Sequence, residues 1–191
     1  MMTWMLAVAA LALPPASATW TPLSASPVRI ECTTAQGVPY CRSTGVVSAA
    51  QPTVVETFAQ LDRHVASMHK ISRIDRLEPD ILHVVMDYPF PLTDRDYVAR
   101  FGRRTESDGT VVFPWSPVTH AKAPDDGSTV RLATMDGEWR FQAEGAGTRV
   151  TYVWQSDPGG NLPDVSAVHK QAGLFAIQDI AAACGARVTG P

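Results

Sequence analysis

The amino-acid sequence predicts an α+β protein in which a curved antiparallel sheet is covered by one long C-terminal helix. Three observations support this prediction. Apolar and polar residues alternate over 138–144 and again over 149–155, a pattern that is typical of half-buried strands. Several shorter strand-like segments precede them, separated by residues that favour turns. Finally, apolar residues in 163–184 recur at helical spacing.

The two alternating segments are the strongest strand signals. In the first, Trp139 and Phe141 share one face while charged and amide side chains occupy the other, and in the second Tyr152 and Trp154 stand on one face in the same way. The residues between the segments, Gly145-Ala146-Gly147, favour a hairpin turn. We therefore expect two paired antiparallel strands with an aromatic inner face.

A change of register is expected just before this pair. Val130 and Leu132 alternate in the opposite phase to Trp139, so the two phases do not belong to one regular strand. Asp136-Gly137 lies between them, and glycine tolerates the backbone of a bulge. The sequence therefore predicts a bulge or bend, and with it curvature of the sheet, near Gly137.

Simpler patterns predict the other elements. Segments 28–32 and 41–48 flank Gly37 and Pro39, which favours a hairpin. Apolar residues at helical spacing over 53–69 indicate one amphipathic helix or two short ones. The remaining strand-like segments are 81–88, 96–103, 111–115 and 129–135.

The last helix is expected to run from about Pro163 to Cys184, because proline in a first helical turn lacks only a donor that would be unpaired there. Val168 and Phe175 lie on one apolar stripe of this helix, and Ile177 lies well away from it. A helix that is apolar over much of its circumference is covered on more than one side. We therefore expect it to lie across the open mouth of a strongly curved sheet.

The first 18 residues have the pattern of a secretory signal peptide. The apolar run 4–13 is followed by Pro14-Pro15 and by the small-residue site Ala16-Ser17-Ala18. The run is shorter than the roughly 20 residues that cross a bilayer, and no later segment is long and apolar enough to do so. We therefore expect cleavage after Ala18 and export of a single domain, 19–191, to the periplasm or the exterior.

The net charge bears on the expected partners, and the cysteines bear on cross-linking of the chain. A net charge of −3 at pH 7 argues against a phosphate-neutralising surface, so nucleic acid is not an expected partner. Cys32 and Cys41 flank a turn-rich segment, and an exported protein meets an oxidising compartment. The sequence is compatible with two interpretations: a Cys32–Cys41 disulfide with Cys184 as a lone thiol, or three reduced cysteines.

Four motifs occur in order along the chain: Pro89-Phe90-Pro91-Leu92-Thr93-Asp94-Arg95-Asp96-Tyr97-Val98, Gly137-x-Trp139-x-Phe141, Gly147-Thr148-x-Val150-x-Tyr152 and Asp157-Pro158-Gly159-Gly160-x-Leu162-Pro163. Their order and spacing, over about 28–184, resemble the START (steroidogenic acute regulatory protein-related lipid transfer) family and its bacterial relatives in the polyketide cyclase superfamily. The resemblance implies a helix-grip fold, in which the C-terminal helix closes a hydrophobic tunnel inside the curved sheet. It also implies binding of a lipid or another apolar small molecule.

A tunnel for such a ligand needs aromatic and aliphatic walls with few polar groups. Our candidate ligand-binding residues are Trp139, Phe141, Tyr152, Trp154, Val168, Ala172 and Phe175. Each of them could equally belong to ordinary core packing, since any sheet and helix core requires such stripes. Met86, Tyr97 and Trp115 are weaker candidates, because the sequence does not show which face of their strands turns inward.

Charged residues and histidines have less specific interpretations. Arg95, within Asp94-Arg95-Asp96, could reach a ligand carboxylate or phosphate, but the flanking aspartates favour a structural or surface ion pair. His64 and His69 are five residues apart, on different faces of a helix, and no ligand at metal-binding spacing accompanies them. We expect neither a metal nor another cofactor.

An enzyme is the alternative function. The sequence contains no hydrolase motif and no phosphate-binding glycine loop. However, His83, His120 or His169 could act as an acid or base if turned inward, with Tyr88 or Asp87 assisting. Such a site would suit a cyclase or aromatase-like enzyme that acts on a polyketide-like substrate. The favoured function is binding of a lipid, with or without transfer, by a monomer that contacts membranes transiently.

Overall fold

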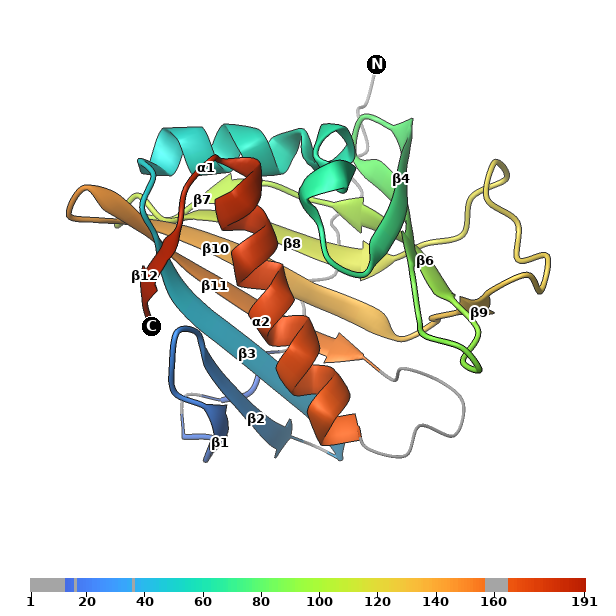
Figure 1. Cartoon of the computed structure of the whole chain (residues 1–191), viewed down its shortest axis with the longest axis horizontal. Coiled ribbons are helices and arrows are strands. Elements are labelled where there is room, and N and C mark those ends of the chain that lie inside the picture. The colour runs from blue at the N-terminus through green and yellow to red at the C-terminus, as the bar shows by residue number, and fades with distance from the viewer. Residues whose placement is uncertain (1–12, 16, 36, 157–164) are drawn as a thin grey trace, which may run out of the picture.

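The computed structural model describes residues 13–15, 17–35, 37–156 and 165–191 (Figure 1). Most of the predicted signal peptide therefore lies outside the described residues. So does the segment 157–164, which contains the fourth motif and the expected first residues of the last helix. Among the described residues, no helix is both long enough and apolar enough to cross a membrane.

One curved sheet forms the body of the protein, and over the described residues it contains 12 strands. Its main path is antiparallel throughout and has the order β1-β2-β3-β11-β10-β8-β6-β5-β4 (Figure 1). The strands of this path are β1 (Thr21–Ser24), β2 (Arg29–Ala35), β3 (Val38–Val47), β4 (Ile71–Glu78), β5 (Ile81–Met86), β6 (Arg95–Phe101), β8 (Val111–Pro117), β10 (Met135–Glu144) and β11 (Gly147–Ser156). Three short strands pair beside it: β7 (Arg104–Thr105) on β8, β9 (Val130–Arg131) on β6 and β12 (Val188–Gly190) on β3.

The helices cover the concave face of the sheet. α2 (Val165–Ala183) lies across this face, and α1 (Gln51–Ala59) packs near its C-terminal end (Figure 1). Two single 3-10 turns, η1 (Leu61–Arg63) and η2 (Val65–Ser67), follow α1. The segment 53–69, for which the sequence predicts one helix or two short ones, therefore does not form one continuous helix. This arrangement confirms the predicted α+β fold, a curved antiparallel sheet held by a C-terminal helix.

The predicted change of register near Gly137 is wrong. β10 pairs with β11 without interruption from Met135 to Glu144, so Gly137 belongs to a regular strand. The opposite phase of Val130 has another cause, because it belongs to the separate strand β9. Gly137 is instead required for close packing, since a Cβ there would lie 2.2 Å from the carbonyl oxygen of Val153.

Small residues set the distance between α2 and one side of the sheet. A Cβ on Gly173 of α2 would lie 2.9 Å from the Trp154 ring and 3.3 Å from the Ser43 side chain. From the sheet, a Cβ on Gly45 would lie 2.9 Å from the side chain of Ile177. α2 is therefore in direct contact with β3 and β11, with no room for larger side chains between them.

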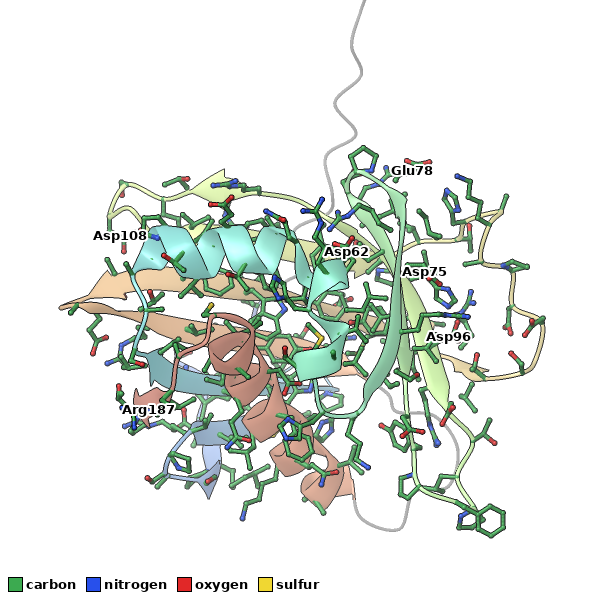
Figure 2. All side chains as sticks on the ribbon, turned by 45° about the horizontal axis from the view of Figure 1, so that its top comes forward. Asp62, Asp75, Glu78, Asp96, Asp108 and Arg187 are labelled. Atoms are coloured by element: carbon green, nitrogen blue, oxygen red, sulfur yellow. A yellow bond between two sulfur atoms is a disulfide. The ribbon has the colours of Figure 1, made fainter. Side chains whose placement is uncertain are left out.

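The convex face of the sheet carries structural ion pairs. Asp96 accepts hydrogen bonds from Arg131 (2.6 Å), Thr129 (2.7 Å) and His83 (2.7 Å). Burial alone would raise the pKa of Asp96, but these hydrogen bonds outweigh it and lower the pKa to about 2. Asp96 and Asp75 lie on the side of β4 and β6 that faces away from α2 (Figure 2). Asp96 thus holds the segment before β10 against the sheet, and the ion pair that it forms is with Arg131 of that segment.

The first hairpin is cross-linked. Cys32 of β2 and Cys41 of β3 are directly opposite each other in the strand register and form a disulfide. Cys184, which follows α2, is not disulfide-bonded. Of the two interpretations compatible with the sequence, the structure therefore shows the one with a disulfide across the hairpin.

Candidate functional site

A cavity of about 190 Å³ lies between the concave face of the sheet and α2. Its floor consists of inward side chains from β4, β5, β6, β8, β10 and β11, and its roof is α2. Phe58 of α1 and Leu61 of η1 close one side. Because nearly all of these side chains are apolar, the cavity favours an apolar occupant.

The mouth of the cavity lies between three segments of the chain. Its solvent-exposed lining residues are His69 and Lys70 before β4, Asp87 and Pro89 after β5, and Gln171 and Ala172 of α2. Next to Pro89, the ring of Phe90 projects into solvent with an exposed fraction of 96%. The polar and charged lining residues thus gather near the mouth.

A polar clip joins two sides of this mouth. Asp179 of α2 is 7% exposed and lines the cavity. It accepts hydrogen bonds from the backbone N–H of His69, and the His69 Nδ1 atom lies 2.6 Å from Asp179 Oδ1. The His69 ring also stacks on Phe175 of α2, with 4.4 Å between ring centroids. Burial raises the pKa of Asp179 although the His69 hydrogen bonds oppose the change.

The inner end of the cavity is aromatic. Tyr152 stacks on Trp139, with 4.1 Å between centroids, and Tyr97 lies 5.6 Å from the Trp115 ring. Phe101 completes this group, with 6.1 Å between its ring centroid and that of Trp115. These rings come from four strands and share the concave face, so they form one continuous wall.

The structure separates the seven predicted ligand-binding residues into two groups. Five line the cavity, namely Trp139, Tyr152, Val168, Ala172 and Phe175. Phe141 and Trp154 are outside the lining and are packed in the core. Phe141 contacts Phe58 of α1, with 5.0 Å between ring centroids, and Trp154 lies beneath Gly173 of α2. The helices therefore cover the two ends of an aromatic face whose middle remains open.

Several lining residues could not be assigned from the sequence. Met86, Tyr97 and Trp115 do turn inward and line the cavity. Phe58, Asp179 and other lining residues of the helical segments carry no sequence signal that separates them from core residues. The sequence offers His69 only as a potential metal ligand, whereas in the structure it lines the mouth of the cavity. Among the described residues, no group of three or more metal-ligating side chains is arranged to hold a metal ion.

The candidate catalytic histidines lie elsewhere in the fold. His83 is paired with Asp96 on the convex face, and His120 lies 3.2 Å from Glu78. His169 of α2 is buried near Trp154, and burial lowers its pKa. None of the three is part of the described cavity lining, although Tyr88 and Asp87 are. Arg95 lies over the Tyr88 ring, 4.3 Å from its centroid.

Fold and cavity together define a helix-grip domain with an internal apolar cavity. The START domain family model matches residues 16–185, and the chain belongs to this family. An uncharacterised protein of Pseudomonas aeruginosa is 36% identical over 84 residues, which cover 41% of this chain and 39% of the relative. The match thus spans about two fifths of that protein's length.

Solved structures agree on the fold. A STAR-related lipid transfer protein from Xanthomonas axonopodis superposes with a TM-score of 0.72 at 19% identity, over 87% of this chain and 98% of that one. The Zhui aromatase/cyclase of a Streptomyces species superposes with a TM-score of 0.51 at 16% identity, over 76% of this chain and 91% of that one. The fold is thus shared by a lipid transfer protein and by an enzyme.

Proposed function

We propose that this protein binds a lipid or another apolar small molecule in the cavity beneath α2, and exchanges it with membranes outside the cytoplasm. The observation that carries the proposal is the apolar cavity between α2 and the aromatic wall of the sheet. Membership of the START family and the likeness to a lipid transfer protein support it.

The cavity volume indicates the size of the occupant. A rigid apolar cavity of about 150 Å³ binds benzene, so the 190 Å³ found here suits a small ring system or a short stretch of chain. A longer lipid would require the walls near the mouth to move outward. We expect that movement at the segment around His69 and Lys70, which is exposed and is attached to α2 by the clip.

Membrane contact is supported by the loop after β5. Phe90 is almost fully exposed and adjoins Pro89, a lining residue of the mouth. Aromatic side chains at such positions favour the interface between lipid and water. We expect Phe90 to enter the bilayer surface while the mouth faces the membrane.

A vesicle experiment tests this contact. Phe90→Asp should reduce co-sedimentation with phosphatidylcholine vesicles and slow transfer of a bound fluorescent lipid several-fold. Ala146→Asp is the matched control, because Ala146 is an exposed residue in the turn between β10 and β11 at the other end of the molecule (Figure 1). Equal effects of the two substitutions would rule out a specific role for the loop.

We propose that the protein is exported, because its N-terminal apolar run is followed by the small-residue site Ala16-Ser17-Ala18, as in a signal peptide. The disulfide between Cys32 and Cys41 supports it, because disulfides persist mainly in oxidising compartments. N-terminal sequencing of protein recovered from the periplasm or medium should give Thr19 as the first residue. Recovery of the uncleaved chain from the cytoplasm alone would overturn this part of the proposal.

We propose binding without turnover. The three histidines considered for acid–base chemistry lie outside the described cavity lining, which favours binding over the cyclase alternative. Native mass spectrometry of protein made in its exported compartment tests the proposal. The wild-type protein should carry a bound lipid, and denaturation should release it chemically unchanged.

Two alanines of α2 give a matched pair for this experiment. Ala176 lines the cavity, whereas Ala182 is exposed on the same helix. Ala176→Phe should fill the cavity and yield ligand-free protein, while Ala182→Phe should carry the same lipid as the wild type. A consistently empty wild-type protein, or an Ala176→Phe variant with unchanged lipid occupancy, would refute binding in this cavity.

A further inference from the structure

Three hydrogen-bonding groups in the cavity wall have no partner among the described residues. Trp115 is 2% exposed, and its Nε1 atom is buried without a hydrogen bond among the described residues. Tyr97 and Tyr152 line the same cavity, and within the described parts of the chain their hydroxyl groups likewise form no hydrogen bond. Buried tyrosine and tryptophan usually place these groups against a partner. Three such groups, all without a partner among the described residues, lie in one apolar wall. They therefore point to a hydrogen-bonding partner that the ligand supplies.

The three groups belong to one place in the sheet. Tyr97 is in β6, Trp115 in β8 and Tyr152 in β11, and all three side chains stand on the concave face. Tyr97 and Trp115 are neighbours, with 5.6 Å between their ring centroids. Only β10 separates Trp115 from Tyr152, because Gly137 of β10 is opposite Trp115 and Trp139, two residues further on, is opposite Tyr152. One small polar group of a ligand can thus be contacted by Tyr97 and Trp115 from one side and by Tyr152 from the other.

The charges of the cavity lie elsewhere. The charged or titratable lining residues other than these tyrosines are His69, Lys70, Asp87, Tyr88 and Asp179, which belong to the mouth and its clip. Burial raises the pKa of both Tyr97 and Tyr152 well above the usual range. An anion is therefore disfavoured at the inner end, where no lysine or arginine lines the described wall.

Donors outnumber acceptors in this group. Each phenol can donate or accept one hydrogen bond, whereas the indole N–H can only donate. We infer that Tyr97, Tyr152 and Trp115 form a subsite for an uncharged oxygen, a hydroxyl or carbonyl group, at the inner end of an amphiphilic ligand. The apolar body of that ligand then occupies the rest of the cavity. This inference rests on the proposed function and specifies the class of ligand.

Three probes with one apolar body separate the contributions. Propylbenzene has no hydrogen-bonding group, 4-propylphenol has a neutral hydroxyl, and 4-propylbenzoate is an anion at pH 7. All are small enough for a cavity that is somewhat larger than one that holds benzene. Affinities are measured by titration of the isotope-labelled full-length mature protein, residues 19–191, with NMR detection. The wild type should bind the phenol about 3- to 10-fold more tightly than propylbenzene, and the benzoate most weakly.

Phenylalanine variants test the named hydroxyls. Tyr97→Phe and Tyr152→Phe keep the rings and remove only the oxygen atoms, and the double variant should bind the phenol and propylbenzene with equal affinity. Its affinity for propylbenzene should stay within about twofold of the wild type. Tyr40→Phe is the control, because Tyr40 is buried but lies outside the cavity lining. Thermal unfolding of each variant shows that the fold is retained.

The outcomes distinguish the inference from the proposed function. If propylbenzene and the phenol bind equally to the wild type, or if the double variant retains the preference for the phenol, the subsite is refuted while cavity binding stands. Tighter binding of the benzoate would also refute it. If none of the three probes binds, the proposed function fails, and the subsite fails with it.

Discussion

Asp179 of α2 and His69 before β4 meet at the rim of the cavity, 110 residues apart in sequence, through both the backbone amide and the ring of the histidine. The carboxylate is almost fully buried, while the histidine side chain is about half exposed. The pair thus connects the helix over the cavity to a solvent-exposed part of the cavity wall.

The first prediction concerns the backbone half of this clip. Asp179→Ala removes the acceptor of the His69 amide, and a hydrogen bond to a charged group is worth about 1.5–3 kcal/mol. Amide hydrogen exchange at His69 should therefore accelerate at least about tenfold. His69→Phe is the control, because it keeps a ring against Phe175 and leaves the backbone amide bonded to Asp179. Unchanged exchange in Asp179→Ala would show that the clip does not hold this segment.

The second prediction concerns acid stability. The pKa of Asp96 is about 2 in the folded protein and close to 4 in an unfolded chain. Because the folded pKa is the lower one, its contribution of about 2 kcal/mol is present above pH 4 and is lost as the pH falls from about 4 to 2. Urea unfolding of the wild type should show this loss between pH 5 and pH 2.

Asp96→Asn provides the comparison. The variant should be less stable at pH 6, and its free energy of unfolding should fall less steeply between pH 4 and pH 2, because other carboxylates still titrate there. Asp80→Asn serves as the control, since Asp80 is exposed and its ion pair is with Arg100 and not with a partner of Asp96. Parallel pH profiles for the wild type and Asp96→Asn would contradict the assignment.

The sequence predicted those parts of the site that depend on local periodicity. Trp139 and Tyr152 followed from strand alternation, and Val168 and Phe175 from helical spacing, and all four line the cavity. The same alternation also selected Phe141, which shares their face. Whether a residue on that face meets the cavity or a helix depends on where the helix crosses, and no local pattern contains that information.

Long-range pairing accounts for most of what could not be predicted. For β4 the sequence indicates only an extended chain from Ile71 onward and no defined strand, because its outward residues Arg73 and Asp75 are polar and it lies at the edge of the sheet. Tyr97 lies between the charged Asp96 and the apolar Val98, so alternation does not decide which face it occupies. Its inward orientation is known only from its pairing with Val84 and its place in the cavity. The inference of a bulge failed for a related reason, since Val130 belongs to a separate short strand.

The third prediction concerns the packing of α2 against β11. In most helix interiors Gly→Ala is stabilising by up to about 1 kcal/mol, but a Cβ at Gly173 would lie 2.9 Å from the Trp154 ring. Gly173→Ala should therefore destabilise the protein by about 1–3 kcal/mol in urea unfolding, as overpacking does. At the exposed position Ala182, in the last turn of α2, the reverse change Ala182→Gly should cost less than about 1 kcal/mol through helix propensity alone. A stabilised Gly173→Ala variant would show that α2 can move away from β11.

The fourth prediction concerns the disulfide. Cys32 and Cys41 close a short loop, and in the chain-entropy description a cross-link of this length contributes about 2–3 kcal/mol. The double variant Cys32→Ser with Cys41→Ser should lose this amount in urea unfolding, and a reducing agent should have no further effect on it. Cys184→Ser should retain the response of the wild type to reduction. Equal stability of oxidised and reduced wild-type protein would contradict the prediction.

The close fit around Gly173 and Gly45 makes the two flanks of α2 unequal. On the side of β3, helix and sheet touch with no flexible side chain between them, so separating them would expose core residues such as Ile177 to water. On the other side, the connection to His69 consists of hydrogen bonds that water can replace and one ring stacked on Phe175. We therefore expect α2 to open on the side of His69, like a panel hinged at β3. In the proposed function, a ligand enters when the contacts of His69 break while the main core stays folded.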